Sequence, residues 1–131
     1  MTGITQTIAS WSPDAQAACR SCAALFDSVA AEAGIGALDN SLKWGQPSWR
    51  PIKPRTGATL RLGWSNAAPD TLSIYVDCKT NLAARFSDIY PAIVNDGRRM
   101  ISFSMPLDGQ QTALRHLAAM TFTYHLRKRA G

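Results

Sequence analysis

The chain has 131 residues, of which 46% are hydrophobic and 18% are charged, with a net charge of +5. This length and composition fit one ordinary globular domain, spanning residues 1–131. No apolar run approaches the roughly 18 residues that a membrane-spanning helix needs. The first fifteen residues lack Lys, Arg and an apolar stretch, so we expect no secretory signal. Three cysteines without a scaffold pattern favour reduced thiols and a cytoplasmic protein.

The first quarter of the chain predicts one long helix. Residues 1–11 are small and polar without a period, and we interpret them as a loose N-terminal arm. Residues 12–14 (Ser-Pro-Asp) are typical of a helix start, with an N-cap, a proline at the first position and an acidic side chain at the positive helix end. Apolar residues recur at helical spacing over residues 15–33. Gly34 and Gly36 then end the helix.

The middle of the chain alternates between apolar and polar residues, as strands do. After a short helical turn at 37–42, residues 49–52 predict a first strand, which Pro51 places at a sheet edge. Residues 58–64 and 71–78 predict two longer strands with one apolar side each. The polar sides, including that of a later strand, carry Thr59, Arg61, Ser73, Tyr75, Asp77, Ser102 and Ser104.

The second half of the chain predicts a short helix, a hairpin and a final helix. Thr80 is suited to cap the short helix over residues 80–90. The Asp-Gly pair at 96–97, between two strand-like runs, is a strong hairpin signal. Asp108 and Gln111 have the spacing of a capping box, and the final helix ends in the basic run at 127–129.

These elements predict an α+β fold. Alternating strands with one apolar face need one layer of helices rather than two. We therefore expect a two-layer sandwich, in which an antiparallel sheet of about five strands packs the N- and C-terminal helices on one face. The opposite face of the sheet would stay open.

Four sequence blocks resemble those of the YdhG-like proteins, which are small bacterial domains of unknown function. The resemblance runs from about the first helix to the last hairpin and implies a compact α+β sandwich of the kind compared with frataxin. For some members this similarity has suggested intracellular iron handling. The blocks are Lys43-Trp44-Gly45-Gln46-Pro47-Ser48, Arg61-Leu62-Gly63-Trp64, Tyr75-Val76-Asp77-Cys78-Lys79-Thr80 and Asp96-Gly97-Arg98-Arg99.

The charges of this chain disfavour an iron role. Iron ions prefer hard oxygen ligands, and a frataxin-like iron surface is a ridge of carboxylates. Here the first helix holds only three dispersed acidic residues, and the strands that follow carry cations instead, which repel a metal ion. The acidic residues are Asp14, Asp27 and Glu32, and the cations are Arg50, Lys53, Arg55 and Arg61.

Cysteine and histidine residues supply no catalytic or metal motif. Cys19 and Cys22 have a Cys-x-x-Cys spacing that could hold a soft metal, but both lie in the apolar arc of their helix, which favours core packing. Cys78 falls on the apolar side of its strand. His116 and His125 are nine residues apart and point in opposite directions on an ideal helix. We therefore expect a binding module rather than an enzyme, without a metal or another cofactor.

The final helix has an apolar arc of roughly 200°, about twice that of an ordinary surface helix. One explanation is that the helix lies between the sheet and the first helix. The other is that part of the arc forms a homodimer contact. The arc consists of Ala113, Leu114, Leu117, Ala118, Met120, Phe122 and Tyr124.

Tryptophans and arginines near the first strands are the candidate ligand site. Rigid aromatic rings beside Arg bind small planar or anionic ligands by stacking and charge-assisted hydrogen bonds, although Trp44 and Trp64 are also suited to a purely structural corner. We expect a small molecule or a protein as the partner. Because the positive charge is spread along the chain, single-stranded nucleic acid, clamped by Arg61 and stacked on Tyr75, is the alternative. The candidate residues are Trp44, Trp49, Arg50, Arg61, Trp64, Tyr75 and Asp77.

Overall fold

Four helices and six strands make up the part of the chain that a computed structural model describes, residues 2–43 and 45–126. The helices are α1 (Thr2–Ile8), α2 (Pro13–Glu32), α3 (Leu82–Ile89) and α4 (Gln111–Phe122). The strands are β1 (Leu38–Lys43), β2 (Gln46–Pro51), β3 (Leu60–Gly63), β4 (Thr71–Tyr75), β5 (Val94–Asn95) and β6 (Met100–Ser104).

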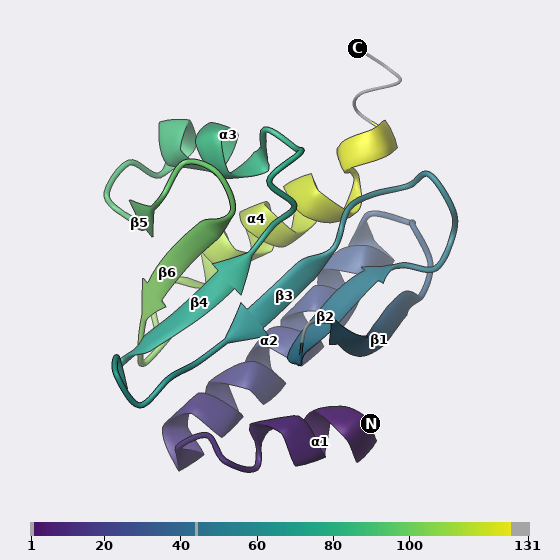
Figure 1. Ribbon diagram of the computed structural model, residues 1–131. Helices are drawn as coiled ribbons and strands as arrows, with labels where there is room; N and C mark the ends of the chain where they lie inside the picture. The colour runs from purple at the N-terminus through teal and green to yellow at the C-terminus, as the bar shows by residue number, and fades with distance from the viewer. Residues whose placement is uncertain (1, 44, 127–131) are drawn as a thin grey trace.

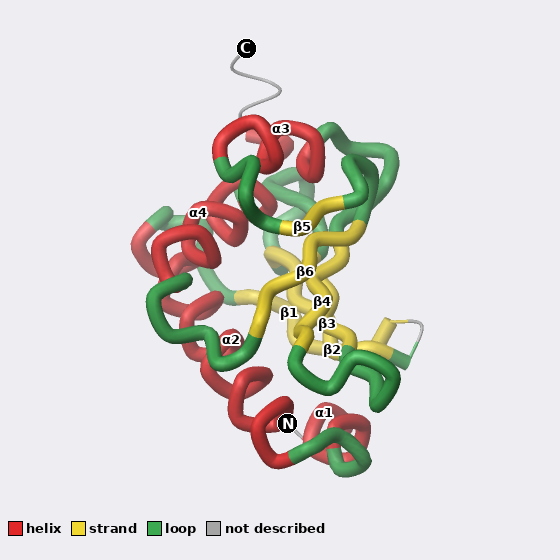
Figure 2. Tube along the Cα trace, turned by 90° about the vertical axis from the view of Figure 1, so that its left-hand side faces the viewer, coloured by secondary structure: helices red, strands yellow, loops and turns green. Residues whose placement is uncertain are grey.

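The strands form one sheet in the order β1-β2-β3-β4-β6-β5, with every neighbouring pair antiparallel (Figure 1). Seen along the sheet, α2 and α4 lie on the same side of the strands (Figure 2). The α+β class and the antiparallel sheet are confirmed, and the described sheet has one strand more than the predicted number. No helix of the described residues has the length and apolar character to cross a membrane.

Helix α2 begins and ends where the sequence predicts. The Ser12 hydroxyl accepts the backbone N–H of Ala15 at 3.1 Å, which satisfies one of the free donors of the first turn. Pro13 occupies the first helical position, where its missing N–H costs nothing. Gly34, just beyond the C-cap, has φ of +69°, a left-handed conformation that glycine adopts without steric cost.

The core lies between the sheet and the two long helices. Phe26 of α2 is fully buried and makes edge-on contacts with Trp49 of β2 and Phe122 of α4, at ring-centroid distances of 5.2 and 5.9 Å. Such contacts add to the stabilisation that comes from the buried area itself. The apolar sides of the central strands complete this layer with Leu60, Leu62, Leu72, Ile74, Ile101 and Phe103.

The N-terminal arm is a wrong prediction, because residues 2–8 form α1. Ile8 is only 1% exposed and belongs to the same core as α2 and the sheet. Trp11, which follows, packs on Trp64 with 6.4 Å between the ring centroids. Ile4, Ile8 and Trp11 have the spacing of one helix face, so the sequence carries a short signal for this helix that the interpretation as a loose arm did not use.

The helical turn expected at 37–42 is also wrong, because this segment is the edge strand β1. Its polar sequence suits an edge, where side chains replace missing ladder bonds, and the Asn40 side chain donates to the Ser48 carbonyl at 3.1 Å. Strand β2 consequently lies inside the sheet rather than at its edge. Pro51 is tolerated because it is the last residue of β2.

Two local predictions in the second half of the chain fail in a similar way. Cys78 is exposed rather than buried, because β4 ends at Tyr75 and the chain turns at Asp77, whose carboxylate accepts the Lys79 N–H. Helix α4 begins at Gln111, so Asp108 does not cap it. The Gln110 side chain instead donates to the carbonyls of Ser104 and Pro106. The basic run at 127–129 lies outside the described residues.

The wide apolar arc of α4 is explained by packing within the chain. The helix touches the sheet on one side, α2 on a second and α3 on a third. Six of the seven arc residues are buried, and only Tyr124, just after α4, is half-buried. Dimerisation through this helix stays a prediction. The apolar arc of α4 is covered by other parts of the chain and does not support a contact with a second copy.

The loop before β3 is joined to the C-terminal end of α4 by backbone hydrogen bonds. Thr56 is 2% exposed and its carbonyl accepts the N–H groups of His125 and Leu126, while the Ala58 N–H donates to Thr121. Gly57 lies so close to α4 that a Cβ there would be 2.0 Å from the carbonyl oxygen of Phe122.

We predict that Gly57→Ala lowers the free energy of unfolding by about 1–3 kcal/mol, the cost of overpacking a tight contact. The colliding atom belongs to the backbone and cannot move without breaking the loop contacts. Urea unfolding followed by circular dichroism measures the change. Asn66→Ala in an exposed loop is the control and should change the stability by less than about 0.5 kcal/mol. Equal stability of both variants would contradict the contact.

Candidate functional site

The predicted tryptophan corner does not form one site. Trp49 is 1% exposed and packs on Phe26, so its place among the ligand-binding residues is wrong. It pairs with Leu60 in the sheet, and this register turns it to the core face. Trp44 lies outside the described residues. Trp64 is half-buried, and its indole N–H donates to the Pro69 carbonyl at 3.0 Å, which anchors the loop before β4.

Arg50 lies on the open face near the sheet edge and is paired. Its Nε is 3.5 Å from a carboxylate oxygen of Asp39, the residue opposite it on β1. Both side chains are exposed, so the pair contributes little to stability. The pair nevertheless offsets the positive charge of Arg50, which is therefore not part of the strongest cationic cluster.

Arg61 and Tyr75 form an ordered cluster on the open face, as strand alternation predicts. They are direct cross-strand partners, and the Arg61 guanidinium carbon lies 5.4 Å from the centre of the Tyr75 ring. Arg61 Nη1 also donates to Gln46 Oε1 at 3.1 Å. Gly63 leaves the room for this arrangement, since a Cβ there would be 2.9 Å from the Gln46 amide nitrogen and 3.1 Å from the Tyr75 ring. The guanidinium is thus held by two neighbours.

A groove of about 460 Å³ adjoins this cluster at the end of the open face. Four cationic side chains line it together with a single carboxylate, that of Asp77, and with the exposed Cys78. The Asp77 carboxylate already accepts the Lys79 N–H at 2.9 Å. The groove is therefore a concentrated positive field with little internal compensation. Its cations are Lys43, Arg61, Lys79 and Arg99.

The β5–β6 turn fixes the backbone of Arg99 beside the end of β4. One carboxylate oxygen of Asp96 accepts the N–H groups of Arg98, Arg99 and Met100 at 2.8–3.0 Å. These hydrogen bonds lower the pKa of Asp96, and the bond from the Met100 N–H has the largest effect. The carbonyl of Arg99 in turn accepts the Val76 N–H at 2.8 Å. The turn thus places Arg99, which is distant in sequence, beside the end of the strand that carries Tyr75.

Three of the four groove cations were missed by reasoning from the sequence. Lys43 ends β1, Lys79 follows β4 and Arg99 precedes β6, so none belongs to the central strands from which the open face was deduced. Their common signal is that each is a basic residue next to the end of a strand. Which strand ends lie close together depends on the order of the strands in the sheet. The sequence does not give that order, so the proximity of these cations could not be predicted.

Cys19 and Cys22 are core residues, as predicted, each 1% exposed. Burial raises the pKa of the Cys19 thiol to about 11 and that of Cys22 to about 12. Both are therefore protonated and poorly nucleophilic at neutral pH. Among the described residues no three His, Cys, Asp or Glu side chains gather as a metal site would require. His116 is half-buried, with its Nδ1 3.2 Å from the Tyr90 hydroxyl.

Comparison with known proteins finds no match for this chain among family models, curated proteins or solved structures. The resemblance to the YdhG-like proteins therefore stays a prediction, and the functional conclusion depends on the geometry of the open face.

The buried thiols predict an alkaline loss of stability. A thiol whose pKa is raised in the folded state keeps its proton there, whereas the unfolded chain releases it above pH 9, so stability falls from pH 9 towards 11–12. Each thiol contributes at most about 1.4 kcal/mol per pH unit. We expect Cys22→Ala to flatten this slope in urea unfolding. Cys78→Ala, at an exposed thiol, should leave the slope unchanged, and parallel slopes for wild type and Cys22→Ala would contradict the assignment.

Proposed function

We propose that this protein is a non-catalytic binding module whose ligand is a small anion carrying phosphate or carboxylate groups. The groove at the end of the open sheet face is the proposed site. One observation carries the proposal: four cations from separate segments of the chain converge on a space of about 460 Å³ that contains one carboxylate. A cavity of this size suits a small molecule.

The state of Arg61 supports an anionic ligand in particular. Its ring contact with Tyr75 and its bond to Gln46 reduce the freedom of the side chain before a ligand arrives. Pre-organisation of this kind lowers the entropy that binding must overcome. Only one of the five N–H donors of Arg61 has a partner among the described residues, so the others are available for charge-assisted bonds to oxygen atoms.

The same contact disfavours the nucleic-acid alternative. Single-strand binding of the stacking type needs an aromatic face on which a base can lie. One face of Tyr75 is covered by the Arg61 guanidinium, and its ring edge lies against Gly63. Trp64 and Trp11, which line a hollow together with Tyr75, pack on each other, and the Trp64 indole N–H donates to the Pro69 carbonyl. The face of Tyr75 that Arg61 covers is therefore not available to a base unless the guanidinium moves.

A cytoplasmic location belongs to the same proposal. The three cysteines are unpaired, and Cys78 is an exposed thiol, which accords with a reducing compartment. The fold is of the sandwich type that the YdhG-like resemblance implies, and membership of that family is proposed on this ground and on the sequence blocks. Iron handling is not part of the proposal, because the groove repels cations.

The test is a titration with pyrophosphate and with citrate, followed by calorimetry. We expect saturable binding that weakens tenfold or more in Arg61→Gln, because a charge-assisted hydrogen bond contributes about 1.5–3 kcal/mol. Lys79→Gln should weaken binding less, since a flexible ammonium forms a looser contact. Arg20→Gln is the matched control, because Arg20 is exposed on α2, on the other side of the sheet.

Absence of saturable binding, or equal losses in Arg61→Gln and Arg20→Gln, would refute the proposed site. A third titration with a twelve-residue oligothymidylate distinguishes the alternative. If the oligonucleotide binds more tightly than pyrophosphate and Tyr75→Leu abolishes that binding, the open face is a nucleic-acid surface instead.

A further inference from the structure

A second cavity, of about 520 Å³, lies on the helical side of the molecule. The first turns of α2 and α4, the loop before β4 and the link from β6 to α4 surround it. It shares no lining residue with the basic groove. Its volume falls within the range of small-molecule sites, so it is large enough for an organic ligand rather than a single ion.

The inner wall of this cavity is apolar and incompletely packed. Leu25 and Met105 line it and are only half-buried, so part of their apolar surface faces the space. Cys22 also lines the cavity although its side chain is 1% exposed, and its thiol has no hydrogen-bond partner among the described residues. A polarisable thiol and a thioether are adaptable partners for an apolar ligand body.

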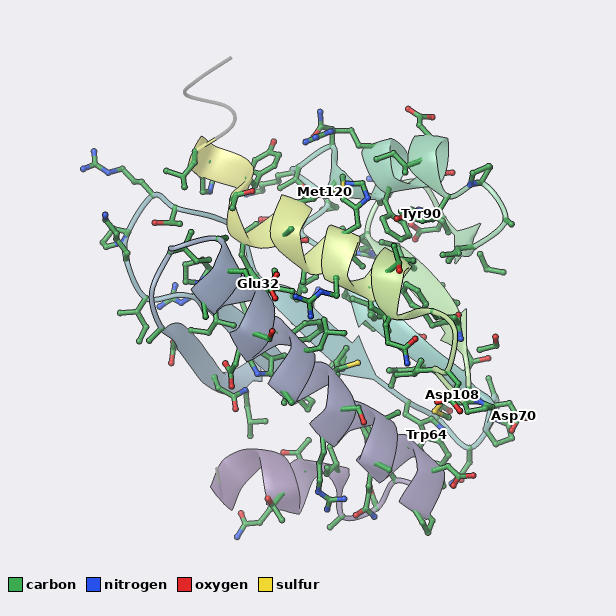
Figure 3. The ribbon with its side chains drawn as sticks, turned by 180° about the vertical axis from the view of Figure 1, so that it is seen from behind. Glu32, Trp64, Asp70, Tyr90, Asp108 and Met120 are labelled. Atoms are coloured by element: carbon green, nitrogen blue, oxygen red, sulfur yellow. The ribbon has the colours of Figure 1, made fainter. Side chains whose placement is uncertain are left out.

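The rim of the cavity carries the opposite charge to the rest of the protein. Asp14, Asp70 and Asp108 line it, and its lining contains no Lys, Arg or His. Figure 3 shows Asp70 and Asp108 beside one another, on two loops far apart in sequence. In the described part of the chain none of these carboxylates forms an ion pair. The protein has a net charge of +5, so three unpaired carboxylates around one cavity reverse the sign of the charge locally.

Helix ends do not neutralise this rim. An α-helix presents about half a positive charge at its N-terminus, and α2 and α4 both begin here. Together they offset roughly one of the three negative charges, which leaves about two. Compensation of helix dipoles therefore accounts for Asp14, in the first turn of α2, but not for all three carboxylates.

We propose that this cavity binds a small organic cation with an apolar body, such as an arylalkyl- or alkylammonium ion. The apolar part would lie against Leu25, Met105 and Cys22, and the ammonium group would lie at the rim between Asp70 and Asp108. Burial of the ligand body supplies affinity, and the carboxylates select for positive charge. This site is independent of the anion site proposed for the open face.

Three probes of similar size test the proposal in the full chain: 4-phenylbutylammonium, octylammonium and 4-phenylbutyrate. Amide chemical shifts in a two-dimensional NMR titration report both affinity and location. We expect both ammonium ions to bind saturably and to shift residues around Cys22 and Leu114, and we expect the carboxylate to bind more weakly. Asp70→Asn and Asp108→Asn should each weaken ammonium binding about twofold to fivefold, the range of exposed ion pairs.

A blocking variant separates the cavity from general surface binding. Ser21 is exposed on α2 and lines the cavity, so Ser21→Phe should fill the mouth and weaken binding tenfold or more. Ser28→Phe is the matched control, at an exposed position of α2 outside the cavity, and should bind as wild type does. Thermal unfolding verifies that the variants are folded. Arg61→Gln should leave ammonium binding unchanged.

Four outcomes would overturn the proposal. The first three are absence of saturable ammonium binding at millimolar concentration, binding that survives Ser21→Phe, and equal affinity for 4-phenylbutyrate and 4-phenylbutylammonium. Loss of binding in Ser21→Phe together with no effect of either Asn substitution would also overturn it, because the carboxylates would then play no part in recognition.

Discussion

Burial of Phe26 against Trp49 and Phe122 connects the three main parts of this fold, the first long helix, the sheet and the last helix. The fully buried large apolar side chains of the central strands lie on this side of the sheet. Because the helices bury one face completely, polar residues of the same strands must occupy the other, where Arg61 and Tyr75 meet. The one-sided core thus explains why Arg61 and Tyr75 lie on the face of the sheet that the helices leave open.

Periodicity and caps in the sequence were sufficient for the long elements. Ser12 and Gly34 delimit the first helix, and alternation assigns Leu62 and Ile74 to the core. The failures lie where tertiary contacts outweigh local pattern. Residues 2–8 form a helix although only Ile8 among their described side chains enters the core, and the polar segment 38–43 forms a strand because β2 supplies its partner. The segment 38–43 lacks the alternation of a strand, whereas residues 4–11 carry a short helical spacing at Ile4, Ile8 and Trp11.

The site was predictable only as far as strand alternation extends. It placed Arg61 and Tyr75 together on the open face, whereas Asp77 lines the groove from the turn that follows β4. It did not identify Lys79 or Arg99, because their proximity depends on the turns after β4 and before β6. Trp49 belongs to the core because its register with Leu60 turns it to the helical side, and a shift of one residue in a strand exchanges the core face for the open face.

Net charge illustrates the same limit on a larger scale. The positive charge is spread along the sequence rather than concentrated in one run, which favours a uniformly solvated surface. Folding separates them, because basic residues at strand ends gather around one groove and aspartates from three segments gather around another cavity. The two spaces lie on opposite sides of the sheet and differ in charge and in apolar character. A single value of +5 averages over both of them, and only the strand order and the turns show that each has its own electrostatic preference.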